Sequence, residues 1–182
     1  MHGTWIRSSI LCALIALTSV TCLLCCSKWS PQRKPVELRY FPIDDMAGII
    51  TRSHVEIDTM ISSDGNGSLR IAAQESTVVR LFETGDVNVE NATLIYQARL
   101  RTERAEGNVY LEMWCSFPGR GEFFSRGLTM PLTGTTDWTT VEIPFFLQGG
   151  QNPDNLKLNL VITGAGTVWV DDVRIIKAPR GL

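Results

Sequence analysis

A set of six side chains could bind a ligand that has both an apolar face and hydroxyl groups. All six lie on the polar side of stretches in which apolar and polar residues alternate, 93–102, 108–117 and 156–163. The set consists of Arg99, Tyr110, Glu112, Trp114, Lys157 and Asn159. Aromatic rings pack against apolar faces, and charged and amide groups hydrogen-bond to hydroxyl groups. The six residues form a candidate binding face, provided that the three stretches are neighbouring strands of one sheet.

Two readings of the aromatic members stay open. An exposed tryptophan and tyrosine are unusual on a surface that only contacts water, which favours a binding role for Trp114 and Tyr110. Alternatively, the connection 118–122 covers Trp114, and the ring then extends the hydrophobic core. The first reading predicts that Trp114 is needed for binding, and the second that it is needed for stability.

Residues that could support catalysis are few. Glu112 and Glu142 could act as two carboxylates, but glycoside hydrolysis requires a fixed separation across a cleft, which the sequence does not indicate. His2 and His54 are isolated, so we expect no histidine metal site or triad and place His54 at the surface. Cys115 lies on the apolar side of its strand, which predicts a buried residue. We therefore expect that the protein is not an enzyme.

The spacing of apolar residues predicts the fold class. From residue 36 onward no window shows helical spacing, and short alternating runs are separated by Gly, Asn, Asp and Pro. This pattern is typical of an all-β protein, and we expect a jelly-roll β-sandwich. The predicted strands are 36–40, 53–60, 68–73, 77–83, 93–102, 108–117, 122–128, 139–145, 156–163 and 167–177.

The last predicted strand, 167–177, has β-branched or aromatic residues on both faces. Strict alternation would give two sets, Val168, Val170, Asp172, Arg174 and Ile176 on one side and Trp169, Asp171, Val173 and Ile175 on the other. A strand of this composition needs a sheet beside it and a second sheet beneath it. Turns are predicted at 64–67 and 164–166, because both segments contain residues that accept a positive φ.

An uncharged apolar run at 10–26 precedes the predicted domain. The run lies at the lower limit of the ~17 to 25 residues of a spanning helix and exceeds the ~7 to 15 residues of most signal-peptide cores. Lys28 and Trp29 suit a membrane interface, which favours one retained N-terminal apolar helix. A cleaved signal peptide and a lipoprotein with an acylated cysteine in 22–26 stay open.

These features divide the chain into four segments. Residues 1–27 are a signal peptide or membrane anchor, 28–35 a linker, 36–177 the β-sandwich and 178–182 a tail. We therefore expect a membrane-anchored protein whose domain lies outside the cytoplasm.

Charge and cysteine content exclude some functions. The 182-residue chain has a formal net charge of -2 and a pI of about 5.7, so we do not expect nucleic acid as a partner. Of the five cysteines, only Cys115 lies in the predicted domain, so no disulfide can form within it.

Several motifs resemble the galactose-binding-like jelly roll of carbohydrate-binding modules, particularly those appended to xylanases and glucanases. They are 64–71 (Asp-Gly-Asn-Gly-Ser-Leu-Arg-Ile), 136–144 (Thr-Asp-Trp-Thr-Thr-Val-Glu-Ile-Pro) and 166–173 (Gly-Thr-Val-Trp-Val-Asp-Asp-Val). The resemblance covers most of residues 40–177. The chain departs from the pattern at 41–45, where Phe-Pro-Ile-Asp-Asp replaces the usual Phe-Glu pair. A second expected departure is that no catalytic domain is attached.

The resemblance also implies a structural Ca²⁺ ion. By position, its ligands would be Asp45 or its neighbour Asp44, Asn66 and Asp171. Hard Ca²⁺ prefers carboxylate and carbonyl oxygens. The alternative is that Asp171 accepts backbone hydrogen bonds at a strand end.

The resemblance and the aromatic face together imply a non-catalytic binding module, with a glycan as the expected ligand. The alternative is a domain of the cell envelope that binds another protein or has a structural role without a sugar ligand.

Overall fold

The computed structural model describes residues 34–180, which fold as an all-β domain without helices in this range. This confirms the predicted fold class. The apolar run 10–26, its predicted helix and the predicted anchor lie outside the described residues. Between residues 34 and 180, no helix is long and apolar enough to cross a membrane.

The strands are β1 (Val36–Phe41), β2 (Val55–Asp58), β3 (Ser68–Ala73), β4 (Thr77–Gly85), β5 (Thr93–Phe117), β6 (Gly121–Arg126), β7 (Leu132–Phe146), β8 (Asn155–Ile162) and β9 (Gly166–Ala178).

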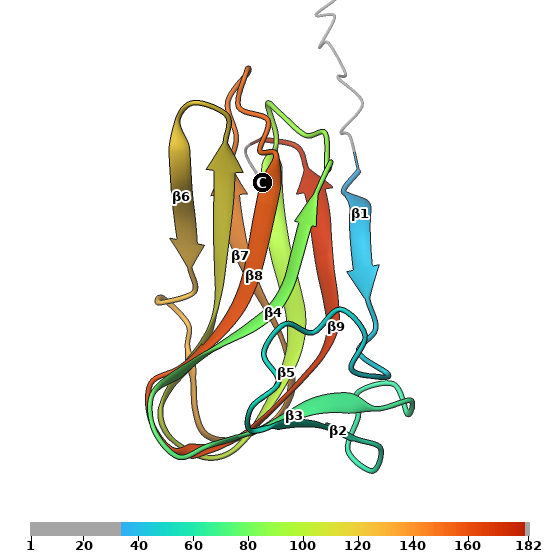
Figure 1. Cartoon of the computed structure of the whole chain (residues 1–182), viewed down its shortest axis with the longest axis vertical. Helices are drawn as coiled ribbons and strands as arrows, with labels where there is room; N and C mark the ends of the chain where they lie inside the picture. The colour runs from blue at the N-terminus through green and yellow to red at the C-terminus, as the bar shows by residue number, and fades with distance from the viewer. Residues whose placement is uncertain (1–33, 181–182) are drawn as a thin grey trace, which may run out of the picture. The chain divides into compact units, whose positions relative to one another are not determined.

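One long bent ribbon determines the architecture (Figure 1). β5 pairs antiparallel first with β9 and then with β8, from Thr93 opposite Ala178 to Ser116 opposite Asn155. β8 and β9 therefore run in the same direction, and the segment 163–165 between them is a bend. The predictions of a turn at 164–166 and of two separate strands at 93–102 and 108–117 are wrong. Local alternation is the same in one bent strand as in two straight ones, so the pattern could not distinguish them.

The bend folds the sheet into two layers. The layer that we call the β9 layer contains β1, β2, β3, β7, β9 and the first half of β5; the β8 layer contains β4, β6, β8 and the second half of β5. The apolar residues that alternate with the candidate binding residues in 93–102, 108–117 and 156–163 are buried in the core between the layers. At its centre Tyr96 is fully buried and its hydroxyl group donates to the Asn159 carbonyl oxygen of the opposite layer at 3.4 Å. The sandwich is thus one sheet packed against itself.

Glycines allow the backbone segments to approach each other at the bend. A Cβ atom on Gly107 would lie 2.6 Å from Thr163 Oγ1 and 2.7 Å from the Thr163 carbonyl carbon. Gly166 has a φ of +146°, and a Cβ atom there would lie 2.7 Å from the Cα atom of Ala105. Because real Cβ atoms do not approach other atoms so closely, the corner requires residues without side chains.

A β-bulge changes the faces of β9. Between Gln97 and Arg99 the register with β5 shifts by one residue, and Asp172 adopts a positive φ of 51°. After the bulge, Val173 and Ile175 are fully buried in the core together with Val168 and Val170. The sequence-based division of this strand into two strictly alternating sets is therefore wrong beyond Asp171, because a bulge inserts one residue that alternation does not count.

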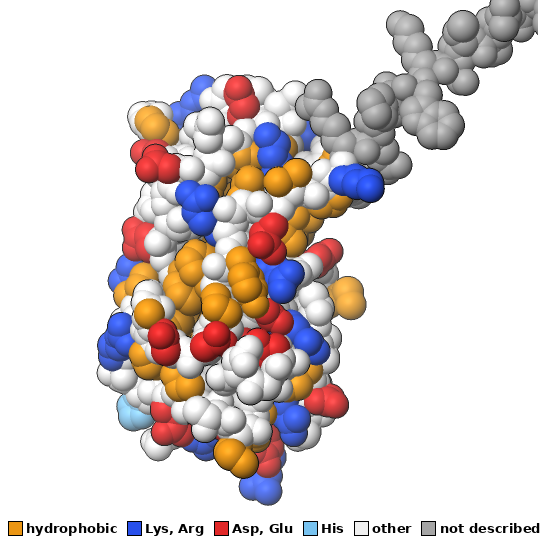
Figure 2. All heavy atoms as spheres, turned by 90° about the vertical axis from the view of Figure 1, so that its right-hand side faces the viewer, with side chains coloured by type: hydrophobic (Ala, Val, Ile, Leu, Met, Phe, Trp, Pro, Cys, Tyr) orange, Lys and Arg blue, Asp and Glu red, His pale blue; other side chains and the backbone are white. Residues whose placement is uncertain are grey.

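Aromatic stacking closes one side of the sandwich. Phe41 of β1 stacks on Phe82 of β4 with ring centroids 4.1 Å apart, and Arg39 donates to the carbonyl oxygens of Gly85 and Asp86 at 3.3 Å. Hydrophobic side chains gather at mid-height on this side of the molecule (Figure 2). A hollow of about 210 Å³ here is lined by Phe82, by residues 40–45 and by Ala47. The two layers are thus joined at this edge as well as at the bend.

The corner geometry predicts a specific loss of stability. Gly107→Ala should lower the free energy of unfolding by about 1–3 kcal/mol or more, because the added methyl group has no space beside Thr163. Gly149→Ala is the matched control, since no atom lies within 4 Å of a Cβ there. Urea unfolding followed by tryptophan fluorescence measures both variants. Equal stability of the two variants would show that the corner does not depend on Gly107.

Candidate functional site

The outer face of the β8 layer brings most of the predicted binding residues together. Trp114 of β5 lies opposite Lys157 of β8, and Glu112 lies opposite Asn159. On the other side of β5, Trp114 pairs with a residue of β6 that the sequence analysis did not select, Phe124. Five of the six predicted residues therefore belong to this layer.

Glu112 is the centre of this face. Its carboxylate is buried, and Oε1 accepts hydrogen bonds from Trp114 Nε1 at 2.8 Å and Asn159 Nδ2 at 3.0 Å. Oε2 accepts from Arg126 Nε at 2.5 Å. Burial alone would raise the pKa of Glu112, but the three donors and the guanidinium charge outweigh it and hold the pKa below its ordinary value. Glu112 thereby fixes the side chains of three strands.

The tryptophan and a phenylalanine form an aromatic pair. The ring centroids of Trp114 and Phe124 lie 4.9 Å apart at an interplanar angle of 47°. Trp114 is partly buried, and Phe124 is 51% exposed. The guanidinium of Arg126 lies 4.4 Å from the Phe124 ring centroid. The ring packed against Trp114 thus comes from β6 and leaves an apolar surface open to a ligand.

A polar hollow adjoins this pair. Its volume is about 320 Å³, and it is lined by Arg80, Trp114, Glu122, Lys157 and Asn159. Lys157 Nζ lies 2.6 Å from Glu122 Oε1, which also accepts from the Ser116 hydroxyl at 2.7 Å. These contacts hold the pKa of Glu122 below its ordinary value, and the hydrogen bond from Lys157 has the largest effect. The hollow therefore presents two cations, an anion and an amide beside an aromatic surface.

Two of the six predicted residues do not fit the binding role. Arg99 pairs with Thr140 and Asp171 in the β9 layer, so the prediction that it shares a face with Trp114 is wrong. The reason is the bend, which places the two halves of β5 in different layers. Tyr110 belongs to the expected layer, but it is only 9% exposed and offers no open ring.

Sequence reasoning missed Arg80, Glu122, Phe124 and Arg126. Alternation within the predicted strand 122–128 does place residues 122, 124 and 126 on one side. No local signal indicated that this strand pairs with the second half of β5. These residues could therefore be assigned to the site only from the order of the strands in the sheet.

The residues considered for catalysis do not form a catalytic group in the described structure: the two glutamates lie in different layers, and the cysteine is buried. Glu142 belongs to β7, where it accepts from Gln97 at 3.1 Å, whereas Glu112 lies in the β8 layer. Cys115 is fully buried, as predicted, and burial raises the pKa of its thiol to about 12. His54 is exposed, also as predicted, and lines a separate hollow of about 470 Å³.

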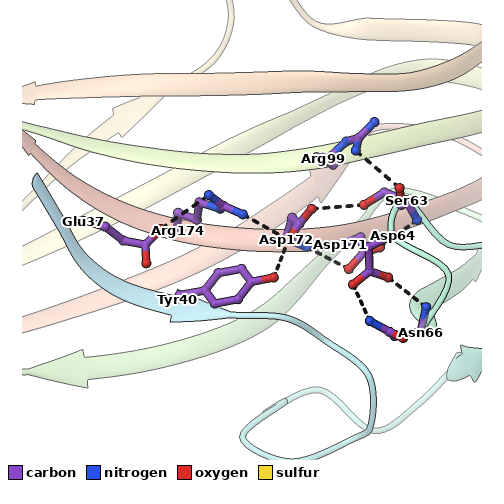
Figure 3. A network of polar contacts seen from close by, with 9 residues as sticks. All are labelled: Glu37, Tyr40, Ser63, Asp64, Asn66, Arg99, Asp171, Asp172 and Arg174. Carbon is purple, nitrogen blue, oxygen red and sulfur yellow. Dashed lines mark hydrogen bonds and ion pairs between the residues drawn. The ribbon is translucent and has the colours of Figure 1, made fainter. Parts of the chain in front are cut away.

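A second polar cluster lies on the β9 layer, around the bulge (Figure 3). Asp171 is fully buried; Oδ2 accepts from the Ser63 N–H and Oδ1 from the Asp172 N–H, both at 2.8 Å. Burial raises the pKa of Asp171 despite these hydrogen bonds. Asp172 accepts from the Tyr40 hydroxyl at 2.6 Å, and this hydrogen bond is the main reason that the pKa of Tyr40 rises to about 12. The cluster attaches the loop after β2 to the bulge.

The donor arrangement in this cluster does not form a cage for Ca²⁺. Both Asp171 oxygens accept backbone N–H groups, Asp45 accepts from the Ala47 N–H at 2.6 Å, and Asn66 Nδ2 donates to Asp64 at 2.8 Å. Within residues 34–180, no group of three His, Cys, Asp or Glu side chains is placed to hold a metal ion. The Ca²⁺ site at Asp45, Asn66 and Asp171 stays a prediction, which a calcium-dependent and EDTA-reversible rise in Tm would support. We give the ion no part in the proposed function.

Comparison with known proteins gives a structural match. No protein-family model and no curated protein sequence matches the chain. Among solved structures, the CBM22-1 xylan-binding domain from Paenibacillus barcinonensis Xyn10C matches with a TM-score of 0.59 and 11% identity over 82% of this chain and 99% of that chain. The chain has the β-sandwich fold of carbohydrate-binding modules.

Two further matches agree with this fold. The CBM22-1 and GH10 modules of Clostridium thermocellum xylanase 10B, complexed with xylohexaose, give a TM-score of 0.58 at 11% identity, covering 80% of this chain and 29% of that chain. A family 16 carbohydrate-binding module gives a TM-score of 0.50 at 11% identity over 67% of this chain and 84% of that chain. The resemblance to carbohydrate-binding-module sandwiches found in the motifs is therefore confirmed at the level of fold.

The buried carboxylate predicts a pH dependence. Because the pKa of Glu112 is lower in the folded protein, its stabilisation is fully present above the unfolded value of about 4.3 and is lost as the pH falls through the folded value. Glu112→Gln should cost about 1.5–3 kcal/mol of unfolding free energy at pH 7 and less at pH 3. Urea unfolding at both pH values measures this difference. A cost that does not change with pH would contradict the role of the charge.

Proposed function

We propose that the protein is a non-catalytic carbohydrate-binding module whose glycan site is the outer face of the β8 layer. One observation carries the proposal: the partly buried Trp114, packed against the half-exposed Phe124, borders a hollow lined by Glu122, Lys157 and Asn159. The fold shared with a xylan-binding domain supports it.

The arrangement matches the chemistry of a sugar ring. One face of a pyranose consists of C–H groups, and it can pack on the rings of Phe124 and Trp114. The hydroxyl groups at the rim of the sugar can bond to groups that keep free capacity. Lys157 has one carboxylate partner for three N–H donors, and Asn159 Oδ1 accepts no hydrogen bond from another side chain of residues 34–180. Sugar recognition here needs no rearrangement of the Glu112 network.

The site is shallow, which favours a chain over a single sugar. The hollow lies on the outer face of a sheet and is lined by strands β4, β5, β6 and β8. A site on such a surface is open at both ends, so the units of a polysaccharide on either side of the bound sugar can extend along the sheet. We therefore propose a polysaccharide or oligosaccharide as ligand.

We further propose that residues 10–26 hold this module at a membrane, outside the cytoplasm. The uncharged apolar run and the flanking Lys28 and Trp29 support this proposal. Extraction of membranes with alkaline carbonate tests it: an anchored chain stays in the pellet, and release into the supernatant would contradict the anchor.

A protein partner without a sugar ligand is the second candidate function. The specific observation in its favour is that β6 exposes two phenylalanine side chains, Phe123 at 50% and Phe124 at 51%. Exposed aromatic residues on an outer strand are typical of association surfaces.

These two phenylalanines give the sharpest test of the glycan site. Phe123 and Phe124 are neighbours on β6 with almost equal exposure, but only Phe124 packs on Trp114. Phe124→Ala should weaken binding about tenfold or more, Trp114→Ala should abolish it, and Phe123→Ala should leave it unchanged. Affinity electrophoresis with xylan and a panel of other polysaccharides identifies a ligand, and calorimetry with an oligosaccharide of that ligand, xylohexaose in the case of xylan, measures the variants.

Circular dichroism of all three variants is the control for folding. If no polysaccharide retards the protein, or if Phe123→Ala and Phe124→Ala weaken binding equally, the proposed face is not the glycan site.

A further inference from the structure

β6 is one of the two outer strands of the β8 layer, and β4 is the other (Figure 1). One edge of β6 pairs with β5, and within residues 34–180 no strand pairs with the other edge. Backbone groups of alternate residues point to opposite edges in an antiparallel ladder. Because the Gly127 N–H donates to the Leu111 carbonyl oxygen at 3.0 Å, the backbone groups of Glu122, Phe124 and Arg126 point to the unpaired edge.

The other outer strands are protected against pairing. The Ile50 and Thr51 N–H groups donate to the carbonyl oxygens of Leu81 and Arg80 and so cover the edge of β4. β7 contains Pro144, which lacks a donor, and its register with β5 shifts at three places. β2 has only four residues, and β1 has an irregular register with β9. β6 has six residues with neither a proline nor a register shift. Among the described strands it is therefore the edge that is open to pairing.

The sequence of β6 complements itself. Its acidic residue, Glu122, lies two positions before Phe124, and its basic residue, Arg126, lies two positions after it. An antiparallel pair of two β6 strands centred on Phe124 places Glu122 of each copy opposite Arg126 of the other. The two Phe124 rings then face each other on the same side of the sheet. This is the self-complementary arrangement that a two-fold interface requires.

We propose that β6 pairs with β6 of a second copy of this chain, forming a two-fold dimer through a continuous sheet. The sheet then runs from β4 of one copy through both β6 strands to β4 of the other. The pairing satisfies the free backbone groups of Glu122, Phe124 and Arg126 and covers part of the exposed Phe123 and Phe124 rings. A second copy fits this edge because Glu122 and Arg126 lie at equal distances on either side of Phe124. The two-fold axis of the pair therefore passes beside Phe124, and each acidic residue lies opposite a basic one.

The dimer has a consequence that rests on the proposed function. Trp114 and Phe124 of each copy would form one row of four rings across the joint, because Phe124 already packs on Trp114. A single glycan chain could then contact both copies, which raises the apparent affinity for long chains over short ones. Dimerisation itself requires no glycan, so the two proposals can fail independently.

Sedimentation of the full chain in a mild detergent without glycan tests the dimer. Glu122→Arg brings positive charges face to face at both ends of the pair, and we expect the dissociation constant of the dimer to rise about tenfold or more. Glu122→Gln should have a smaller effect. Glu83→Arg on β4 is the matched control, because Glu83 has a similar exposure, 37% against 40% for Glu122, and also forms one ion pair.

Cross-linking locates the contact. Phe124→Cys should form a disulfide between two copies of the peptide that contains position 124, identified by mass spectrometry after mild oxidation. Val78→Cys, at the same exposure of 51%, should not cross-link to itself. A monomer at all concentrations, a dimer that responds equally to the substitutions at 122 and 83, or absence of the cross-link at 124 would overturn the proposal.

Discussion

The close approach of two backbone segments at the bend, one in β5 and one between β8 and β9, is the constraint on which this structure depends. The strands β3–β4, β5 and β8–β9 all change direction there, and each continues from one layer into the other. Gly107 and Gly166 allow the contact, since a side chain at either position would collide with the facing backbone. Because the strands bend together, their inner faces meet in one core and their outer faces point away from each other. Two separate outer surfaces result from one sheet.

Each outer surface has a buried carboxylate at its centre, and the two carboxylates have different environments. Glu112 accepts only from side chains, including the guanidinium of Arg126, and its pKa is lowered. Asp171 accepts from the backbone N–H groups of Ser63 and Asp172 beside a second carboxylate, that of Asp172, and its pKa is raised by burial. Glu112 therefore arranges side chains that a ligand can contact. Asp171 instead fixes the backbone of a loop, a structural role.

β6 connects the candidate site with the edge of the molecule. Phe124 and Arg126 complete the face around Trp114 by their side chains, while their backbone groups point to the edge with which no strand of residues 34–180 pairs. A short strand can serve both purposes because side chains and backbone hydrogen bonds point in perpendicular directions. Phe124 and Arg126 thus contribute their side chains to the face around Trp114 and their backbone groups to the edge at which a further strand can pair.

The sequence by itself determined the fold class and the inward or outward direction of most side chains. Alternation correctly predicted the buried set of β8 and both halves of β5, because the period of two is a local property of extended backbone. It also placed Glu112, Trp114, Lys157 and Asn159 on outward positions. Tertiary structure alone decided which outward residues meet. The bend separates Arg99 from Trp114, the bulge at Asp172 reverses the faces of β9, and pairing with β6 brings Phe124 and Arg126 to the site. These three outcomes depend on contacts between distant segments, which no local pattern of residues encodes.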